Sequence, residues 1–146
     1  DAKDFYKNIS KIREKCGDRP VLRALHFFEE DVRVEREVAA LNAGDFNGFL
    51  QTVKESGDSS FKYLQNIYTN KDVQNQSVSM GLAVSDSILK GHGVSRVHGG
   101  GFAGTIQAFV ADDFVEEYRT MLDSVYGAGS CHVLKVRPYG GIKVLE

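Results

Sequence analysis

The chain has 146 residues, of which 42% are hydrophobic and 26% are charged, an ordinary balance for one globular domain with its own core. Its 18 basic and 20 acidic side chains leave a formal net charge of −2, so the overall charge gives no strong attraction to nucleic acid or to an anionic membrane. No apolar run approaches the roughly 18 residues that span a bilayer, and the first residues lack the apolar core of a signal peptide. We therefore expect a cytoplasmic protein without a nucleic-acid or membrane partner.

Cysteine and histidine usage predicts neither a disulfide framework nor a metal site. Cys16 and Cys131 lie far apart and outside any CxxC motif, so both are expected to be free thiols. The histidines, which show no HExxH or paired-ligand spacing, are His26, His92, His98 and His132. The chain begins with Asp1 rather than methionine, which is compatible with a piece of a longer protein.

The first part of the chain shows helical periodicity in three segments. Apolar residues three and four positions apart predict a surface helix over residues 1–16, closed by Gly17. Asp18 offers a cap to a longer helix that ends at the break over residues 42–44. Asp45 caps a third helix, which we expect to pair with the second as a helical hairpin.

Three charged or polar residues lie on adjacent turns of the second predicted helix: His26, Glu30 and Arg33. Their spacing is that of a catalytic cluster, but pairing along a helix flank is the commoner explanation. We assign them no chemistry. Farther along, the stretch 57–60 predicts an interruption before a short helical segment from Phe61 to Ile67.

A further helix is expected from Asp72, which offers a cap, to the break over residues 91–93. It includes four serines, so its stability must come from tertiary packing. Asp112 or Asp113 caps a last helix that ends near Gly127.

Residues 94–111 form the most unusual stretch, in which two strand-like segments flank a loop with four glycines in six residues. Such a loop can turn successive N–H groups into an anion-binding concavity, or it can be a tight connection that binds nothing. These alternatives stay open. The candidate ligand-binding residues are Gly99, Gly100, Gly101, Phe102 and Gly104.

The same loop matches GxGxxG through Gly99, Gly101 and Gly104, the dinucleotide-binding pattern. In that motif the last glycine opens a helix that holds the pyrophosphate. Here residues 105–110 alternate and are rich in β-branched and aromatic residues, so they predict a strand. The context disfavours a dinucleotide-binding fold.

Two more strands are expected at the C-terminal end, over Cys131–Val136 and Ile142–Leu145, around a turn over residues 138–141. The second half then reads β, β, α, β, β. This order predicts an α+β fold with a four-stranded antiparallel sheet and helices packed mainly on one face. No P-loop, Gly-x-Ser-x-Gly elbow or fixed carboxylate pair is present in the sequence, so no self-sufficient active site is visible.

Two long stretches resemble the GHMP small-molecule kinases. Residues 93–110, GVSRVHGGGFAGTIQAFV, are similar to the third conserved motif of that family, which reads approximately GSRxTG[AG]GFGG in galactokinases. Residues 21–60 resemble the upstream galactokinase segment, with matching order and spacing at Arg23, His26, Arg33, Ala40-Leu41, Gly44-Asp45, Phe49-Leu50, Ser56 and Ser59. The resemblance covers nearly the whole chain.

The resemblance implies that residues 1–146 are a GHMP kinase C-terminal domain with a ferredoxin-like sandwich fold, and that the N-terminal kinase domain is its partner. The parent enzyme would transfer the γ-phosphoryl group of ATP to the C1 hydroxyl of galactose, with ATP and Mg²⁺ bound mainly by the N-terminal domain. This chain would carry no catalytic residue and would be inactive alone. Gly99–Gly104 would lie against the phosphate loop of the other domain, and Arg96 and His98 point into that cleft or away from it.

The chain departs from the family pattern at two places. Ala103 stands where galactokinases usually have glycine, so the loop is expected to have less backbone freedom, and residues 66–83 replace a YEVSxPELD stretch. The second departure leaves the sugar open, so a kinase for N-acetylgalactosamine or another sugar is an alternative. A non-catalytic module that binds a small ligand or regulates is the alternative from another class.

Overall fold

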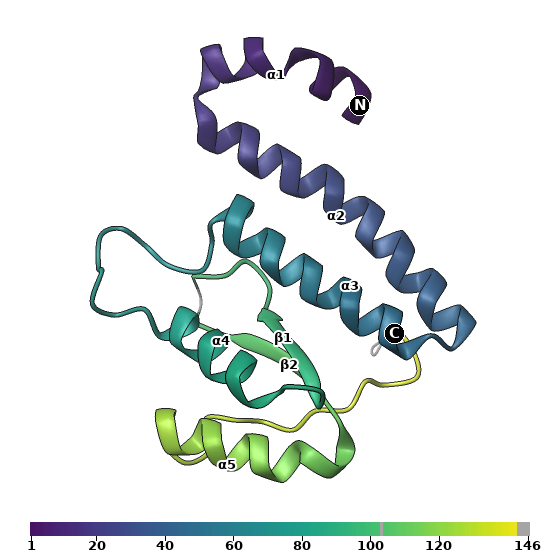
Figure 1. Ribbon diagram of the computed structural model, residues 1–146, viewed down its shortest axis with the longest axis vertical. Helices are drawn as coiled ribbons and strands as arrows, with labels where there is room; N and C mark the ends of the chain where they lie inside the picture. The colour runs from purple at the N-terminus through teal and green to yellow at the C-terminus, as the bar shows by residue number, and fades with distance from the viewer. Residues whose placement is uncertain (103, 143–146) are drawn as a thin grey trace.

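The computed structural model describes residues 1–102 and 104–142. Within them the chain is α+β and mostly helical, with one two-stranded antiparallel sheet (Figure 1). The elements in chain order are α1 (Ala2–Cys16), α2 (Asp18–Ala43), α3 (Phe46–Ser59), the π-helical turn η1 (Ser60–Leu64), α4 (Ser77–Ile88), β1 (Gly93–Val97), β2 (Ile106–Val110), the 3-10 turn η2 (Asp112–Phe114) and α5 (Val115–Tyr126). No helix of the described ranges is long and apolar enough to cross a membrane.

The helical hairpin predicted from the sequence is confirmed by α2 and α3, which lie side by side (Figure 1). Gly44 ends α2 in the left-handed conformation, with φ of 69°. Asp45 caps α3 by accepting a hydrogen bond from the N–H of Gly48 at 2.9 Å. Asp18, predicted to be a cap, instead lies in the first turn of α2 and pairs with Arg13 of α1.

The predicted interruption at residues 57–60 is wrong, because α3 runs through Gly57 and continues into η1. A Cβ atom on Gly57 would lie 2.9 Å from the Cβ of Arg96. This glycine therefore lets α3 pack closely on β1, and it does not end the helix. Helix α4 also starts later than predicted, since Asp72 accepts from the N–H groups of Gln74 and Asn75 in a separate turn.

The two strands pair as predicted, with Val97 opposite Ile106 beside the glycine-rich connection. Side chains alternate along a strand, and the Phe109 ring packs edge-on against Phe49 of α3 with 5.2 Å between ring centroids. On the other face, Val97 packs with Ile67 and with Val78 of α4. Helices therefore cover both faces of the ribbon (Figure 1), which corrects the expectation that they gather mainly on one face.

The predicted strand Cys131–Val136 is wrong, because residues 127–142 contain no strand. A strand needs a neighbouring chain for its ladder of hydrogen bonds. Here Leu134 and Val136 are 86% and 91% exposed, and the segment is held at Cys131, whose N–H donates to the Asp123 carboxylate at 2.9 Å. Of the predicted strand Ile142–Leu145, residues 143–145 lie outside the described residues. The described part of the sheet thus has two of the four expected strands.

Candidate functional site

The glycine loop, defined here as Gly99–Gly104, connects β1 to β2, and the predicted strand, loop, strand context is confirmed. Most of its described residues are exposed, namely Gly99, Gly100, Phe102 and Gly104. Positive φ angles occur at Gly99, Gly101, Phe102 and Gly104. The loop therefore lies at the surface, and its exposed glycines have no side chain that covers their backbone.

Gly101 is the buried member of the loop, and it lies against Asn66, which follows η1. A Cβ atom on Gly101 would lie 2.1 Å from the backbone oxygen of Asn66, and its φ is 76°. The N–H of Phe102 donates to the same oxygen at 3.0 Å. Asn66 thus anchors the loop, and glycine at position 101 is required by close approach as well as by backbone conformation.

The side chain of Asn66 has unmet hydrogen-bonding capacity. The residue is 3% exposed, and neither Oδ1 nor Nδ2 has a hydrogen-bond partner among the described residues. Buried polar atoms are almost always paired, so both atoms mark a place where a partner is to be expected. Sequence reasoning missed Asn66, because a single asparagine in a polar stretch carries no local signal.

Gly100 differs from Gly101, since the fold itself does not require a glycine there. Its φ is not positive, and no atom lies within 4 Å of the place where a Cβ would stand. The residue is exposed. The backbone at Gly100 is therefore open to close approach by another molecule.

Arg96 and His98, the candidates that flank the loop, are separated by the fold. Arg96 faces the α2–α3 pair, with its Cβ against Gly57 of α3 and its Nη1 3.5 Å from Glu30 Oε1 of α2. Its Nε donates to the Val97 carbonyl at 3.2 Å. His98 is exposed, and its Nδ1 lies 3.4 Å from Gln107 Oε1. Arg96 therefore belongs to the interior, and His98 lies beside the glycine loop.

The residues to which the sequence gave no chemistry form a buried polar network between α2 and α3. Arg33 is 8% exposed; its Nε donates to Glu30 at 2.8 Å and its Nη2 to Ser59 Oγ at 2.9 Å. His26 Nδ1 lies 3.0 Å from the same Ser59 oxygen, and Ser56 donates to Glu30. The signal available in the sequence was the shared face of His26, Glu30 and Arg33 opposite two serines of the paired helix.

Burial and neighbouring charges shift the titration of this network. Burial lowers the pKa of His26, the charges of Arg33 and Arg96 lower it further, and Glu30 opposes them. His26 Nδ1 and the Arg33 guanidinium both form a hydrogen bond with the Ser59 hydroxyl, which accepts from Arg33. Burial alone would raise the pKa of Glu30, but hydrogen bonds from Ser56 and Arg33 and the charges of Arg33 and Arg96 lower it overall. Since Ser59 is 4% exposed, the network serves packing better than nucleophilic chemistry.

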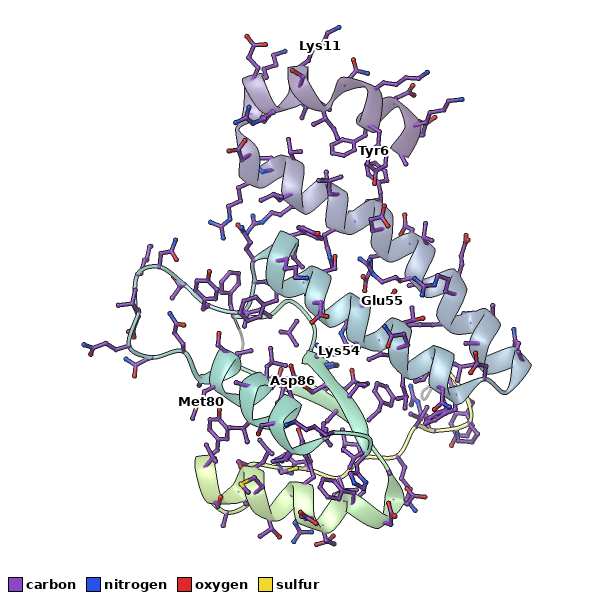
Figure 2. All side chains as sticks on the ribbon, viewed as in Figure 1. Tyr6, Lys11, Lys54, Glu55, Met80 and Asp86 are labelled. Carbon is purple, nitrogen blue, oxygen red and sulfur yellow. The ribbon has the colours of Figure 1, made fainter. Side chains whose placement is uncertain are left out.

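A hollow of about 310 Å³ lies between α3, η1, α4 and β1. Lys54 of α3 and Asp86 of α4 approach each other across it (Figure 2), with 3.6 Å between Nζ and Oδ2. Lys54 also binds Asp58 at 2.7 Å. Burial alone would lower the pKa of Lys54, but the Asp58 hydrogen bond and both carboxylate charges raise it. The positive charge of Lys54 is thus already compensated by two carboxylates of the same chain.

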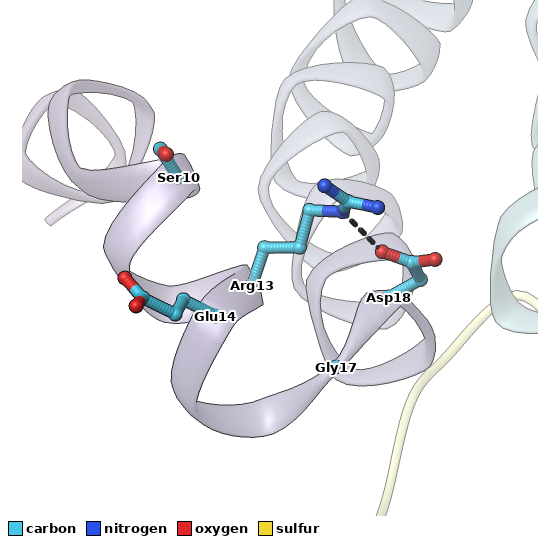
Figure 3. A pocket seen from close by; sticks show the side chains of 5 residues that line it. All are labelled: Ser10, Arg13, Glu14, Gly17 and Asp18. Carbon is cyan, nitrogen blue, oxygen red and sulfur yellow. Dashed lines mark hydrogen bonds and ion pairs between the residues drawn. The ribbon is translucent and has the colours of Figure 1, made fainter.

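A second hollow lies where α1 turns into α2 (Figure 3). Its residues are Ser10, Arg13, Glu14, Gly17 and Asp18, and Arg13 pairs with Asp18. Both side chains of this pair are about two-thirds exposed, so water screens their attraction and the pair is of little energetic weight. The hollow is formed by the helix corner and includes none of the predicted site residues.

Within residues 1–102 and 104–142, no group of three or more His, Cys, Asp or Glu side chains is arranged to hold a metal ion. Cys16 and Cys131 are free thiols, as predicted. No protein-family model, curated protein or solved structure matches this chain. The glycine loop with Asn66 is therefore the candidate site on the strength of its geometry.

Proposed function

We propose that this chain is the C-terminal part of a sugar kinase, a galactokinase or a close relative. The parent enzyme transfers the γ-phosphoryl group of ATP to the C1 hydroxyl of galactose. ATP and Mg²⁺ are held mainly by an N-terminal domain, which is the partner of this chain. The observation that carries the proposal is the exposed glycine loop between β1 and β2, in which Gly100 has no role in the fold.

The contribution of this chain is positioning. Phosphoryl transfer needs little covalent chemistry from the protein, and most of the rate enhancement comes from orientation and from stabilising charge. Backbone N–H groups at Gly99 and Gly100 lie on the exposed part of the loop, where they support a phosphate or the loop that binds it. Asn66 and the β1–β2 ladder hold the loop in place from behind.

Mg²⁺ supplies charge neutralisation on the transferred phosphoryl group when it is bound. No residue of this chain is assigned to the metal, because the described residues include no suitable cluster. The resemblance to GHMP kinases assigns the catalytic residue to the N-terminal domain, so the proposal places none in this chain and expects the chain by itself to be inactive.

The test is ADP release by the longer enzyme to which the proposal assigns this chain, with Mg²⁺-ATP and a panel of galactose, N-acetylgalactosamine, glucose and arabinose. Galactose-dependent ADP release is the expected result, and release with another sugar would reassign the acceptor. Phosphorylation by the 146-residue chain alone would contradict the division of labour between two domains. If none of the four sugars causes ADP release, the alternative of a small-ligand-binding module would be favoured.

A further inference from the structure

Asn66 combines two properties that the folded chain does not explain. Its amide is buried beneath Gly101, and both polar atoms of that amide lack a hydrogen-bond partner among the described residues. Only its backbone oxygen is engaged, by the N–H of Phe102. Leaving a buried donor and a buried acceptor unpaired destabilises the folded state, so the amide is better explained by a partner that binds there.

Phe102 is a second unusual residue at the same place. Its φ of 24° is rare for a residue with a side chain, and the ring is 59% exposed. Strained backbone and exposed aromatic rings both occur at ligand-binding sites. The N–H of Phe102 donates to the backbone oxygen of Asn66 at 3.0 Å, so the two unusual residues are in direct contact.

The chemistry of the amide defines what it can bind. Nδ2 donates two hydrogen bonds and Oδ1 accepts, whereas the oxygens of a phosphate ester dianion carry no proton and only accept. Such a dianion at this place would leave Oδ1 unpaired. A neutral edge with a donor and an acceptor side by side satisfies both atoms, as two adjacent sugar hydroxyls do, or the N6 and N7 edge of adenine.

We infer that Asn66 is a ligand-binding residue at the base of the glycine loop, and that it binds a neutral edge carrying a hydrogen-bond donor and acceptor, of a sugar or of adenine. This inference rests on the proposed role of the glycine loop as a ligand-binding element. Both amide atoms are buried next to Gly101 in this structure, so ligand binding there requires that the backbone at Gly101 move aside. Gly99 and Gly100, which the proposed function assigns to a phosphate or its loop, are exposed and lie apart from the buried amide.

The first arm of the test compares stability. Asn66→Leu replaces an unpaired amide by an apolar side chain of similar size, and the midpoint of thermal unfolding is expected to rise by about 4 °C. Asn47→Leu is the matched control, because Asn47 is exposed on α3, and it should leave the midpoint nearly unchanged. A fall of the Asn66→Leu midpoint would mean that the amide is satisfied inside the folded chain, for example by buried water, and would overturn the inference.

The second arm follows the side-chain amide resonances of Asn66 in the ¹⁵N-labelled chain, assigned by their loss in Asn66→Leu. Galactose, adenine and inorganic sulfate, a dianion that carries no proton at neutral pH, are added separately at millimolar concentration. We expect galactose or adenine to shift these resonances and sulfate to leave them in place, and the responding probe identifies the edge. A response to sulfate alone, or to none of the three, would overturn the inference.

These arms are independent of phosphoryl transfer. An enzyme that releases ADP with galactose while the Asn66 resonances stay silent would keep the proposed function and overturn the inference. Resonances that respond to a neutral probe, in a protein that phosphorylates no sugar, would keep the inference and overturn the kinase proposal.

Discussion

Two buried polar sites among the described residues, the network between α2 and α3 and the amide of Asn66, differ in how many hydrogen-bond partners the fold supplies. In the network of His26, Glu30, Arg33 and Ser59, the paired helices α2 and α3 supply a partner for each side chain. At Asn66, the described residues supply a partner for the backbone oxygen and none for the side-chain amide. The network between α2 and α3 finds its hydrogen-bond partners within the chain, whereas the amide of Asn66 needs a partner from outside the described residues.

This difference distinguishes polar groups that stabilise the fold from polar groups that are left for a ligand. A satisfied buried network fixes the register of α2 on α3, and through Arg96 it reaches β1, the strand that leads into the glycine loop. An unsatisfied group makes no such contribution and lowers stability. Mutations in the two clusters should therefore change stability by different amounts and even in opposite directions.

The largest effect is expected from breaking the satisfied network at its centre. Arg33→Leu removes a hydrogen-bond donor from both Glu30 and Ser59 and should lower the free energy of unfolding by about 3 kcal/mol. The Glu30 carboxylate, 25% exposed, then loses its nearest positive charge and keeps only Ser56 and the more distant Arg96. Arg36→Leu is the control on the same helix: Arg36 pairs with Glu55, but half of its side chain is exposed, and about 0.5 kcal/mol is expected. Urea unfolding measures both; equal losses would show that the network has no special weight.

Local patterns in the sequence were enough for the helices and for the β1–β2 ribbon. The cap at Asp45 and the left-handed glycine at position 44 act over one or two turns, so they are visible without a fold. The buried network of Arg33 and Glu30 could not be predicted from such local patterns. Ser59, which binds Arg33, and Ser56, which binds Glu30, both come from α3, so the network forms only when α2 and α3 pair.

The wrong predictions concern segments whose structure depends on tertiary contacts. Gly57 lies in a stretch with the composition of a helix break, but its missing Cβ lets β1 pack closely on α3. Residues 131–136 alternate like a strand, but in the described chain no neighbouring strand pairs with them. The glycine loop was predicted as a candidate site in full, whereas Asn66 beneath it depends on a contact across 35 positions that no local pattern contains.

The next effect in size tests the anchor of the glycine loop. Gly101→Ala should lower the free energy of unfolding by about 2 kcal/mol, because the new Cβ would meet the backbone oxygen of Asn66 and φ is 76°. Gly99→Ala is the comparison, since it shares a positive φ but has open space around it, and about 1 kcal/mol is expected. Calorimetry on both variants gives the difference; the same loss in each would mean that the contact with Asn66 is absent in solution.

A smaller effect is expected from pH. The pKa of His26 is lowered in the folded chain by burial and by the charges of Arg33 and Arg96, so between that pKa and about 6.5 the unfolded chain binds the extra proton. Stability should therefore be fully present above pH about 6.5, fall as the pH drops below it, and level off below the folded pKa. Urea unfolding at a series of pH values measures this slope. His26→Asn, which keeps an acceptor near Ser59, should remove it, and an unchanged slope would assign it to other groups.

The smallest effect on stability, and the sharpest on function, is expected at Gly100. Gly100→Ala should change the free energy of unfolding by no more than about 0.5 kcal/mol, because φ is not positive and the new methyl group meets open space. If the loop lies against a phosphate or a second domain, the same methyl group obstructs that approach, and kcat/KM of the longer enzyme should fall at least about tenfold, or 1.4 kcal/mol. Gly140→Ala is the matched control, since Gly140 is also exposed, lacks a positive φ and has no neighbour within 4 Å. If the Gly100→Ala enzyme is as active as the Gly140→Ala enzyme, the loop only connects the two strands. The unpaired amide of Asn66 would then need an explanation other than a ligand-binding loop.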